Sequence, residues 1–339
     1  MIQNPHDLLF RSVLGQPEHA RGVLRGIVPP EITHTIDWSQ LALQPGSFVD
    51  LVQTPRYTDL LYSTRWLDGS ELGLYLLFEH QSTLPTEGMM AHRLLRYMGR
   101  IWDRWRADHP TARSLPIILP IVLYHGAAPW SEPRAFDALL EAPSASRHAL
   151  APYLVRFEYL LHDLSAISDD ELRAGAQLTA LAKLVSVCLK HAREGAALLD
   201  VLRRWMDVAR EVALAPNGLD ALAQVIRYIL EVAEQIEETT LQELLGQEIG
   251  PEAKDTVMTI AQRYIEQGRQ QGLEQGRQQG LEQGRQRLQL LLLRLLRKSF
   301  GEAVTPAVEA RITAASGADI EAWSERVLSA VTLDDVFAG

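Results

Sequence analysis

The segment 59–81, DLLYSTRWLDGSELGLYLLFEHQ, constrains the fold of this chain more than any other. Two stretches rich in Leu, Tyr and Phe flank the turn sequence Asp-Gly-Ser at 68–70. A three-residue connection with glycine at a position of positive φ is common in β-hairpins. A hairpin with this loop pairs Asp59 with Glu79, and since side chains alternate along a strand, Glu79 and Gln81 share one face. The hairpin therefore predicts a site with two carboxylates and an amide.

Asp59 and Glu79 are either ordinary solvated acids or part of a functional site. Glu79 follows the apolar run 74–78, so its backbone should lie near the core. A buried carboxylate is unfavourable unless it is paired, hydrogen-bonded or bound to a metal. If they are ordinary surface residues, both acids lie at a solvated sheet edge. A register that differs by one residue would put Asp59 and Glu79 on opposite faces, so the strand pairing tests the idea.

Composition limits the class of protein. The chain has 339 residues, of which 47% are hydrophobic, which suffices for two or three modules. The net charge of -10 argues against a non-specific nucleic-acid coat, although it permits a local basic groove. Cys188 is the only cysteine, so neither a disulfide framework nor a cysteine-based zinc site is expected. The N-terminus lacks the pattern of a signal peptide. We expect a soluble, cytoplasmic protein that does not bind membranes.

Elements on either side of the hairpin indicate the fold class. The patterns predict two helices within 5–29 that break at 15–17, a loop over 31–46, strands at 47–52, 116–124 and 153–160, and a helix over about 87–107. Two prolines in the strand 116–124 suggest that it is bulged or lies at a sheet edge. The order helix, strand, hairpin, helix, strand predicts an α/β protein with a mixed sheet and helices on its faces.

Arginines follow one side of the predicted helix 87–107 at spacings of three and four residues. They are Arg93, Arg96, Arg100 and Arg104, and Tyr97 lies one turn after the first of them. Taken alone, such a stripe is usually a solvated helix face. Because this helix directly follows the strand that ends at Gln81, we expect its first turns to lie beside the carboxylates.

Four further residues are weaker candidates for the site. Asp50 lies in the predicted strand 47–52. His6 and Asp7 could reach the site from the first helix, although a capping role is favoured for Asp7. His125 follows the strand 116–124, where a turn or core histidine is the favoured interpretation.

The C-terminal half has a different character. Residues 168–245 carry helical periodicity and are interpreted as four or five helices, within an α-helical support region that covers residues 166–265. Residues 266–287 repeat the unit GRQQGLEQ, with glycine at every fourth position. A helical stalk that self-associates through close helix approach is favoured over a flexible tether. Residues 288–339 should form a small helical domain, completed in one interpretation by a second copy.

Motifs in the first half of the chain resemble a known family. They are HDLLFRSVL, SFVDLVQTPRYTDLLYS, LYLLFEHQST, RLLRYM and LPIILPIVLYHG. Their order resembles the recombination-promoting nuclease (Rpn) family, also described as YhgA-like or putative-transposase proteins. The resemblance covers residues 5–165 and continues more loosely to MTIAQRYIEQGRQQG. It implies a PD-(D/E)xK-type nuclease domain over residues 1–165, with an α-β-β-β-α-β core.

The resemblance implies a role for each residue of the hairpin site. Asp59 takes the Asp position of the superfamily motif, Glu79 the Glu position, and Gln81 the place of the Lys. Asp59 and Glu79 would hold Mg²⁺, or alternatively Mn²⁺ or Ca²⁺, with the backbone carbonyl of His80 as a further ligand. Gln81 can orient a water molecule but lacks the positive charge of a lysine. The metal or Arg93 would therefore have to provide more of the charge that stabilises the phosphate.

The implied function is a metal-dependent DNA endonuclease of low sequence specificity, linked to recombination or mobile elements. The stripe would contact the DNA backbone largely without reading sequence. Its contact residues would be Arg93, Arg96, Tyr97 and Arg100. The alternative is a catalytically degenerate nuclease fold that acts as an oligomerisation or interaction module.

Overall fold

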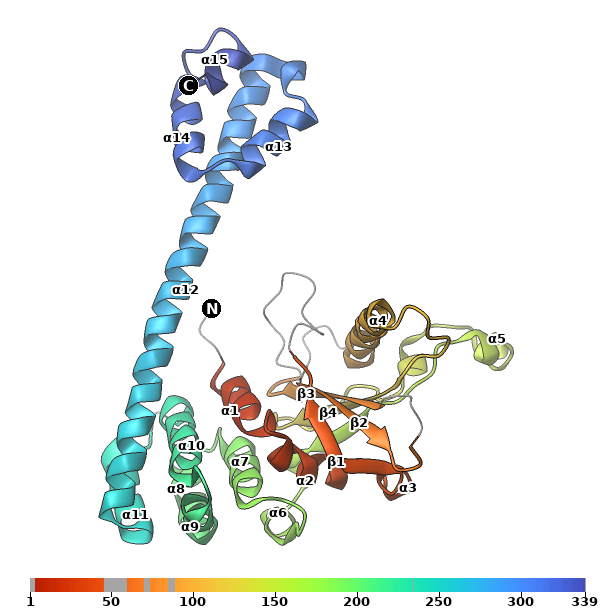
Figure 1. Cartoon of the computed structure of the whole chain (residues 1–339), viewed down its shortest axis with the longest axis vertical. Coiled ribbons are helices and arrows are strands. Elements are labelled where there is room, and N and C mark those ends of the chain that lie inside the picture. Colours follow the sequence, from red (N-terminus) through yellow and green to blue (C-terminus); the bar gives the residue numbers. More distant parts are fainter. Residues whose placement is uncertain (1–3, 46–59, 70–73, 85–88, 234, 339) are drawn as a thin grey trace. The chain divides into compact units, whose positions relative to one another are not determined.

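The computed structural model describes residues 4–45, 60–69, 74–84, 89–233 and 235–338 (Figure 1). These residues form two compact units, one that ends at Ile265 and one that begins at Glu266. The described helices include none that is long and apolar enough to cross a membrane.

A five-stranded sheet lies at the centre of the first unit, in the order β1-β2-β3-β4-β5. Its strands are β1 (Ile36–Leu43), β2 (Leu60–Trp66), β3 (Leu74–Gln81), β4 (Ile117–Tyr124) and β5 (Leu160–Asp163). The pairs β1/β2 and β2/β3 are antiparallel, whereas β3/β4 and β4/β5 are parallel. Helix α4 (Met90–Asp108) connects the parallel strands β3 and β4. The predicted α/β class with a mixed sheet is confirmed.

The predicted hairpin register is also confirmed. Leu60 pairs with Phe78 and Thr64 with Leu74, which is the register that a loop at 68–70 predicts. Gly69 has a φ of 76°, a conformation that glycine adopts without the steric penalty of a Cβ atom. Asp59, the outermost residue of the predicted pairing, lies outside the described residues.

The predicted loop over 31–46 is wrong, because it contains β1. The apolar residues Ile36, Trp38, Leu41 and Leu43 change phase halfway along the strand. The pairing with β2 shifts between Asp37 and Ala42, so an irregularity in the ladder breaks the period of two that would have revealed the strand. The strand predicted at 47–52 lies outside the described residues.

Two predictions about the other side of the sheet need correction. Strand β4 is not at an edge, since it pairs with β3 and β5. Its pairing with β5 begins only at Ile121, so Pro120 lies just before the part of β4 that has neighbours on both sides. The last strand is β5 at Leu160–Asp163 rather than 153–160, and the two ranges share only Leu160.

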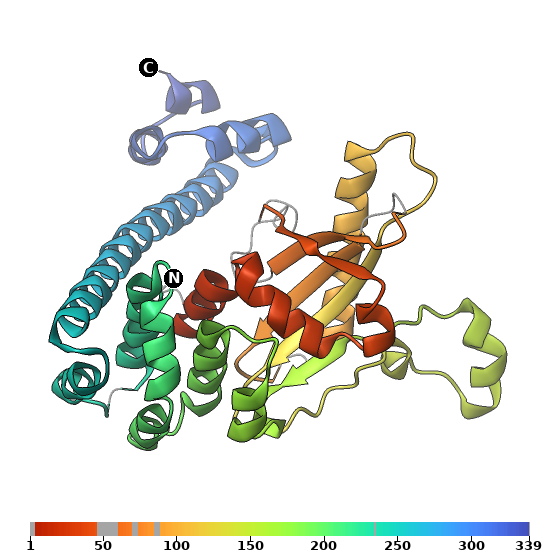
Figure 2. The same ribbon diagram turned by 60° about the horizontal axis from the view of Figure 1, so that its bottom comes forward.

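The two faces of the sheet belong to two hydrophobic cores. Side chains at odd positions of β3, such as Leu77, pack with α4. Those at even positions, such as Phe78, pack with α1 (Pro5–Leu14) and α2 (Pro17–Ile27), which lie on the opposite side of the sheet from α4 (Figure 2). The predicted break between the first two helices, at 15–17, is confirmed. A short helix, α3 (Pro30–Thr33), leads into β1, and α5 (Ser144–Leu150) lies between β4 and β5.

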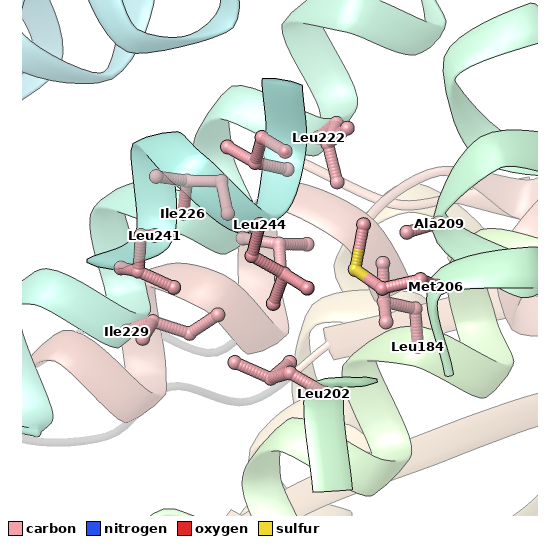
Figure 3. A pocket seen from close by; sticks show the side chains of 11 residues that line it. Leu184, Leu202, Met206, Ala209, Leu222, Ile226, Ile229, Leu241 and Leu244 are labelled. Carbon is pink, nitrogen blue, oxygen red and sulfur yellow. The ribbon is translucent and has the colours of Figure 1, made fainter. Parts of the chain in front are cut away.

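Six helices begin in the described residues between 168 and 245, more than the four or five predicted. They are α6 (Asp169–Ala174), α7 (Ala180–His191), α8 (Ala197–Arg204), α9 (Met206–Leu214), α10 (Gly218–Val232) and α11 (Glu238–Ile249). Apolar side chains from α7 to α11 meet around a small gap (Figure 3). Its volume of about 10 Å³ leaves room for at most one water, so this region is packed core and not a ligand site.

Helix α12 (Pro251–Phe300) contains the whole glycine repeat, which confirms the predicted helix over 266–287. The predicted helix over 288–300 is the last part of α12. The helix ends at Phe300, and the next residue, Gly301, has a φ of 53°. The second unit then adds α13 (Pro306–Ala314), α14 (Gly317–Arg326) and α15 (Leu333–Phe337). These helices enclose a separate small core with Leu292 and Leu296 of α12.

Candidate active site

Glu79 is a buried carboxylate near the end of β3, with only 1% of its surface exposed. It lies on the α4 face of the sheet, the face that Tyr75 and Leu77 also occupy. Gln81 Nε2 donates a hydrogen bond to Glu79 Oε1 at 2.7 Å. The prediction that Glu79 and Gln81 share one face is therefore confirmed, and Glu79 is not a solvated edge residue.

Helix α4 provides the positive charge nearest to this carboxylate. Arg93 Nη2 lies 2.6 Å from Glu79 Oε1, and the side chain of Arg93 is 21% exposed. Arg93 Nη2 also contacts Met90 Sδ at 3.3 Å, which fixes the guanidinium along the first turn of the helix. The expectation that the first turns of this helix lie beside Glu79 is confirmed.

The second carboxylate oxygen of Glu79 has a different environment. Oε2 is buried and lacks a hydrogen-bond partner among the described residues. Burial raises the pKa of Glu79 to about 7, although the Arg93 charge and the Gln81 hydrogen bond act in the opposite direction. Because an unpaired buried carboxylate oxygen is unfavourable, Oε2 is a natural ligand for a cation.

The remaining residues that the sequence singled out lie in different environments. On α4, Arg96 is exposed and Arg100 is half-buried. Tyr97 is 5% exposed and belongs to the core beneath the helix, so its ring is not a surface group. Arg104 pairs with Asp108 at 3.1 Å. Asp59 and Asp50 lie outside the described residues.

His80 contributes to both sides of the strand. Its backbone carbonyl accepts a hydrogen bond from Gln81 Nε2 at 2.8 Å, on the side of the candidate site. Its ring lies on the opposite face, where Nδ1 is 2.9 Å from Asp7 Oδ1. Asn4, not Asp7, caps the first helix, since its side chain accepts from the backbone N–H of His6. The favoured capping role of Asp7 is therefore wrong.

Sequence reasoning missed the buried histidine cluster behind β3. His125 is 2% exposed, as expected of a core histidine, and its Nε2 is 2.9 Å from His80 Nε2. Burial, with smaller effects from neighbouring charges, lowers the pKa of His125 to about 2. His6 Nδ1 lies 2.8 Å from the hydroxyl of Tyr228. These contacts join residues far apart in the chain, and the only available signal was that each histidine borders an apolar run.

The described part of the chain contains no group of three or more His, Cys, Asp or Glu side chains placed to hold a metal. Glu79 Oε2 is thus one ligand position, with the His80 carbonyl nearby in sequence. A complete metal site over these elements needs a further ligand.

The fold and the site define an α/β protein with a buried carboxylate at the end of a central strand. Comparison with known proteins gives the family: residues 4–219 match the family described as "Putative transposase, YhgA-like". The chain belongs to this family. A search of solved structures finds no significant match.

Curated relatives cover most of the chain. It is 29% identical to "Recombination-promoting nuclease RpnD" of Escherichia coli O157:H7, over 76% of this chain and 93% of that protein. It is 28% identical to "Recombination-promoting nuclease RpnA" of Escherichia coli strain K12, over 78% of this chain and 85% of the relative. The "Inactive recombination-promoting nuclease-like protein RpnE" of strain K12 is 29% identical, over 79% and 84% of the two chains.

Proposed function

We propose that this protein is a metal-dependent DNA endonuclease of low sequence specificity that acts in recombination or on mobile elements. The observation that carries the proposal is the buried carboxylate of Glu79, which has one oxygen paired with Arg93 and the other unpartnered among the described residues. The names of the relatives RpnD and RpnA, both recombination-promoting nucleases, support the reaction class.

The order of elements supports a PD-(D/E)xK-type core. Helices α1 to α3 are followed by β1, β2 and β3, then by α4 and β4, which is the order α-β-β-β-α-β. The first strand is β1, which differs from the one that the sequence predicted. In this proposal Glu79 takes the Glu position, Gln81 the place of the Lys, and Asp59 the Asp position.

The donor set fits a hard divalent cation such as Mg²⁺, Mn²⁺ or Ca²⁺. Such ions take carboxylate and carbonyl oxygens as ligands. Glu79 Oε2 and the His80 carbonyl would hold the ion together with Asp59. Burial raises the pKa of Glu79, and a cation bound at Oε2 would favour its ionised form. A bound cation would supply charge stabilisation to the phosphate and lower the pKa of a bound water.

The protein's own residues would bind and orient the substrate. Gln81 fixes Glu79 Oε1 through its amide and keeps one amide group at the site. Arg93 supplies the positive charge that glutamine at position 81 lacks, and its guanidinium suits a phosphate oxygen. Arg96 and Arg100 extend the same side of α4 and would contact the DNA backbone without reading sequence.

A second candidate is a degenerate nuclease fold that acts as an interaction module. The relative RpnE, which is named inactive, is as similar to this chain as RpnD is. Self-association through the glycine repeat on α12 belongs to both proposals.

Nicking of supercoiled plasmid tests the two proposals. We expect the full-length protein to nick the plasmid with Mg²⁺ and to lose this activity with EDTA. Glu79→Ala and Asp59→Ala should each abolish nicking. Glu141→Ala, which changes an exposed acid between β4 and β5, is the matched control and should nick like the wild type.

Equal nicking by the wild type and both site variants would contradict the proposed site. No nicking by a folded wild type with Mg²⁺, Mn²⁺ or Ca²⁺ would favour the interaction module. Metal-dependent cleavage of RNA but not of plasmid would correct the substrate and keep the site.

A further inference from the structure

Polar side chains lie behind β3, on the face of the sheet opposite Glu79, and contact one another. The carboxylate of Asp7 on α1 contacts His80 Nδ1 at 2.9 Å. His80 Nε2 contacts His125 Nε2 at 2.9 Å. His125 Nδ1 lies 2.9 Å from the carbonyl oxygen of Leu189 on α7. One line of hydrogen bonds therefore crosses from the first helix, through the ends of β3 and β4, to a helix that follows the sheet.

The direction of each hydrogen bond follows from what its partner can do. The Leu189 carbonyl can only accept, so His125 Nδ1 carries a proton. A neutral His125 then has an unprotonated Nε2, which accepts a hydrogen bond from His80 Nε2. On the other side of the ring, Asp7 Oδ1 lies 2.9 Å from His80 Nδ1. His80 is thus held at both ends.

Backbone contacts join the same two strand ends. The N–H of His125 donates to the carbonyl of Gln81 at 3.2 Å. Arg193, just after α7, donates to the carbonyl of His125 at 2.7 Å and also to the carbonyl of Ser82. The residues that follow β3 and β4 are therefore tied together by one guanidinium.

We propose that His80, His125 and Arg193 are positioning residues that hold the end of β3 so that Glu79 is placed for cation binding. This inference rests on the proposed function. Glu79, His80 and Gln81 are consecutive, and their side chains alternate between the two faces of the sheet. Fixing the His80 ring on one face therefore fixes the direction of Glu79 and Gln81 on the other.

The helical region after the sheet would then help to position Glu79. Leu189 and Arg193 belong to the region after the sheet, and both contact the end of β4. Groups that orient metal ligands without touching the metal commonly change metal affinity by about 10- to 100-fold when they are mutated.

Direct metal binding tests the inference without relying on activity. We would titrate full-length protein with Mn²⁺ and follow free Mn²⁺ by electron paramagnetic resonance. His125→Phe keeps the ring volume but removes both ring hydrogen bonds, and we expect its Kd for Mn²⁺ to rise by about tenfold or more. Tyr228→Phe removes a partly buried hydrogen bond to His6 in the same cluster and should leave the Kd within about twofold.

A second variant keeps the test decisive if His125→Phe fails to fold. Arg193 is exposed, so Arg193→Leu should fold, and we expect it to weaken Mn²⁺ binding, with partial recovery in Arg193→Lys. Arg203→Leu removes an exposed arginine that pairs with Asp200 on α8 and serves as its control. Thermal unfolding of each variant separates lost stability from lost affinity.

Three outcomes would contradict the proposals in different ways. If wild type binds Mn²⁺ through Glu79, but both His125→Phe and Arg193→Leu bind equally well, the positioning role is wrong and the proposed function stands. If Glu79→Ala binds Mn²⁺ like the wild type, the proposed site itself fails. If Zn²⁺ stabilises Glu79→Ala but not His125→Phe, the two imidazoles hold a metal instead of a hydrogen bond, and the positioning role is wrong.

Discussion

Glu79 owes its chemical character to its surroundings. Burial raises its pKa from 4.5 to about 7, whereas Arg93 and the amide of Gln81 favour the ionised form. The folded protein therefore binds a proton at Glu79 more tightly than the unfolded chain does. Between these two pKa values the folded state carries more protons, so the free energy of unfolding must fall as the pH rises.

We predict that the metal-free wild type loses stability as the pH rises through the range from 4.5 to about 7, and that Glu79→Gln lacks this part of the loss. The difference between the two proteins should reach at most about 3 kcal/mol. Urea unfolding at several pH values measures it. Parallel stability curves for the two proteins would show that the carboxylate titrates normally.

Residue-level prediction succeeded where the contacts were local. The period of two placed Glu79 beside Gln81, and the position of α4 directly after β3 placed Arg93 beside them. The contacts of His80 with Asp7 and His125 span 73 and 45 residues of sequence. No local pattern encodes such contacts, because they form only when α1, β3 and β4 have packed.

At the level of elements, turn chemistry and ladder regularity decided what was predictable. The turn at 68–70 fixed the β2/β3 register, which the structure confirms. Strand β1 was missed because its register shifts between Asp37 and Ala42. Prolines suggested an edge position for β4, but Pro120 only has to precede the residues that pair with β5.

Helix α12 provides a test of the proposed self-association. A Cβ atom added at Gly272, Gly276 or Gly280 meets nothing within 4 Å in one copy of the chain. Replacing all three by alanine should therefore stabilise the helix, by about 0.5–1 kcal/mol for each residue. If two copies approach each other along these glycines, the same triple variant should self-associate less.

Analytical ultracentrifugation and circular dichroism of the triple variant measure the two effects separately. An unchanged association constant together with higher helix stability would show that the glycines are not a contact surface. Arg269 is an exposed residue of the same helix. Arg269→Ala is the control for loss of a side chain without a change at glycine.

At the scale of the whole chain, the helical region shares a core with the sheet. Phe78 of β3, Cys188 of α7 and Val257 of α12 belong to one hydrophobic cluster. Helical periodicity alone could not show this, since a stripe that covers a sheet and a stripe inside a separate bundle have the same pattern. The second unit has its own core around Leu292 and Trp323.

We predict that a fragment of residues 1–165 does not fold cooperatively, because it lacks helices α7 and α10, which pack against α1 in the shared core. A fragment of residues 1–265 retains that whole cluster and should fold. Thermal unfolding and limited proteolysis of both fragments measure this. Cooperative unfolding of the shorter fragment would show that the helices from α6 onward are dispensable.

The most direct test of the central claim is anomalous diffraction from crystals of the full-length protein soaked in Mn²⁺. We predict an anomalous peak within about 2–2.5 Å of a Glu79 carboxylate oxygen, with Asp59 as a second ligand, and the loss of this peak in Glu79→Gln. A peak between His80 and His125, or no peak near Glu79 at saturating Mn²⁺, would contradict the claim that this buried carboxylate holds the metal of a nuclease.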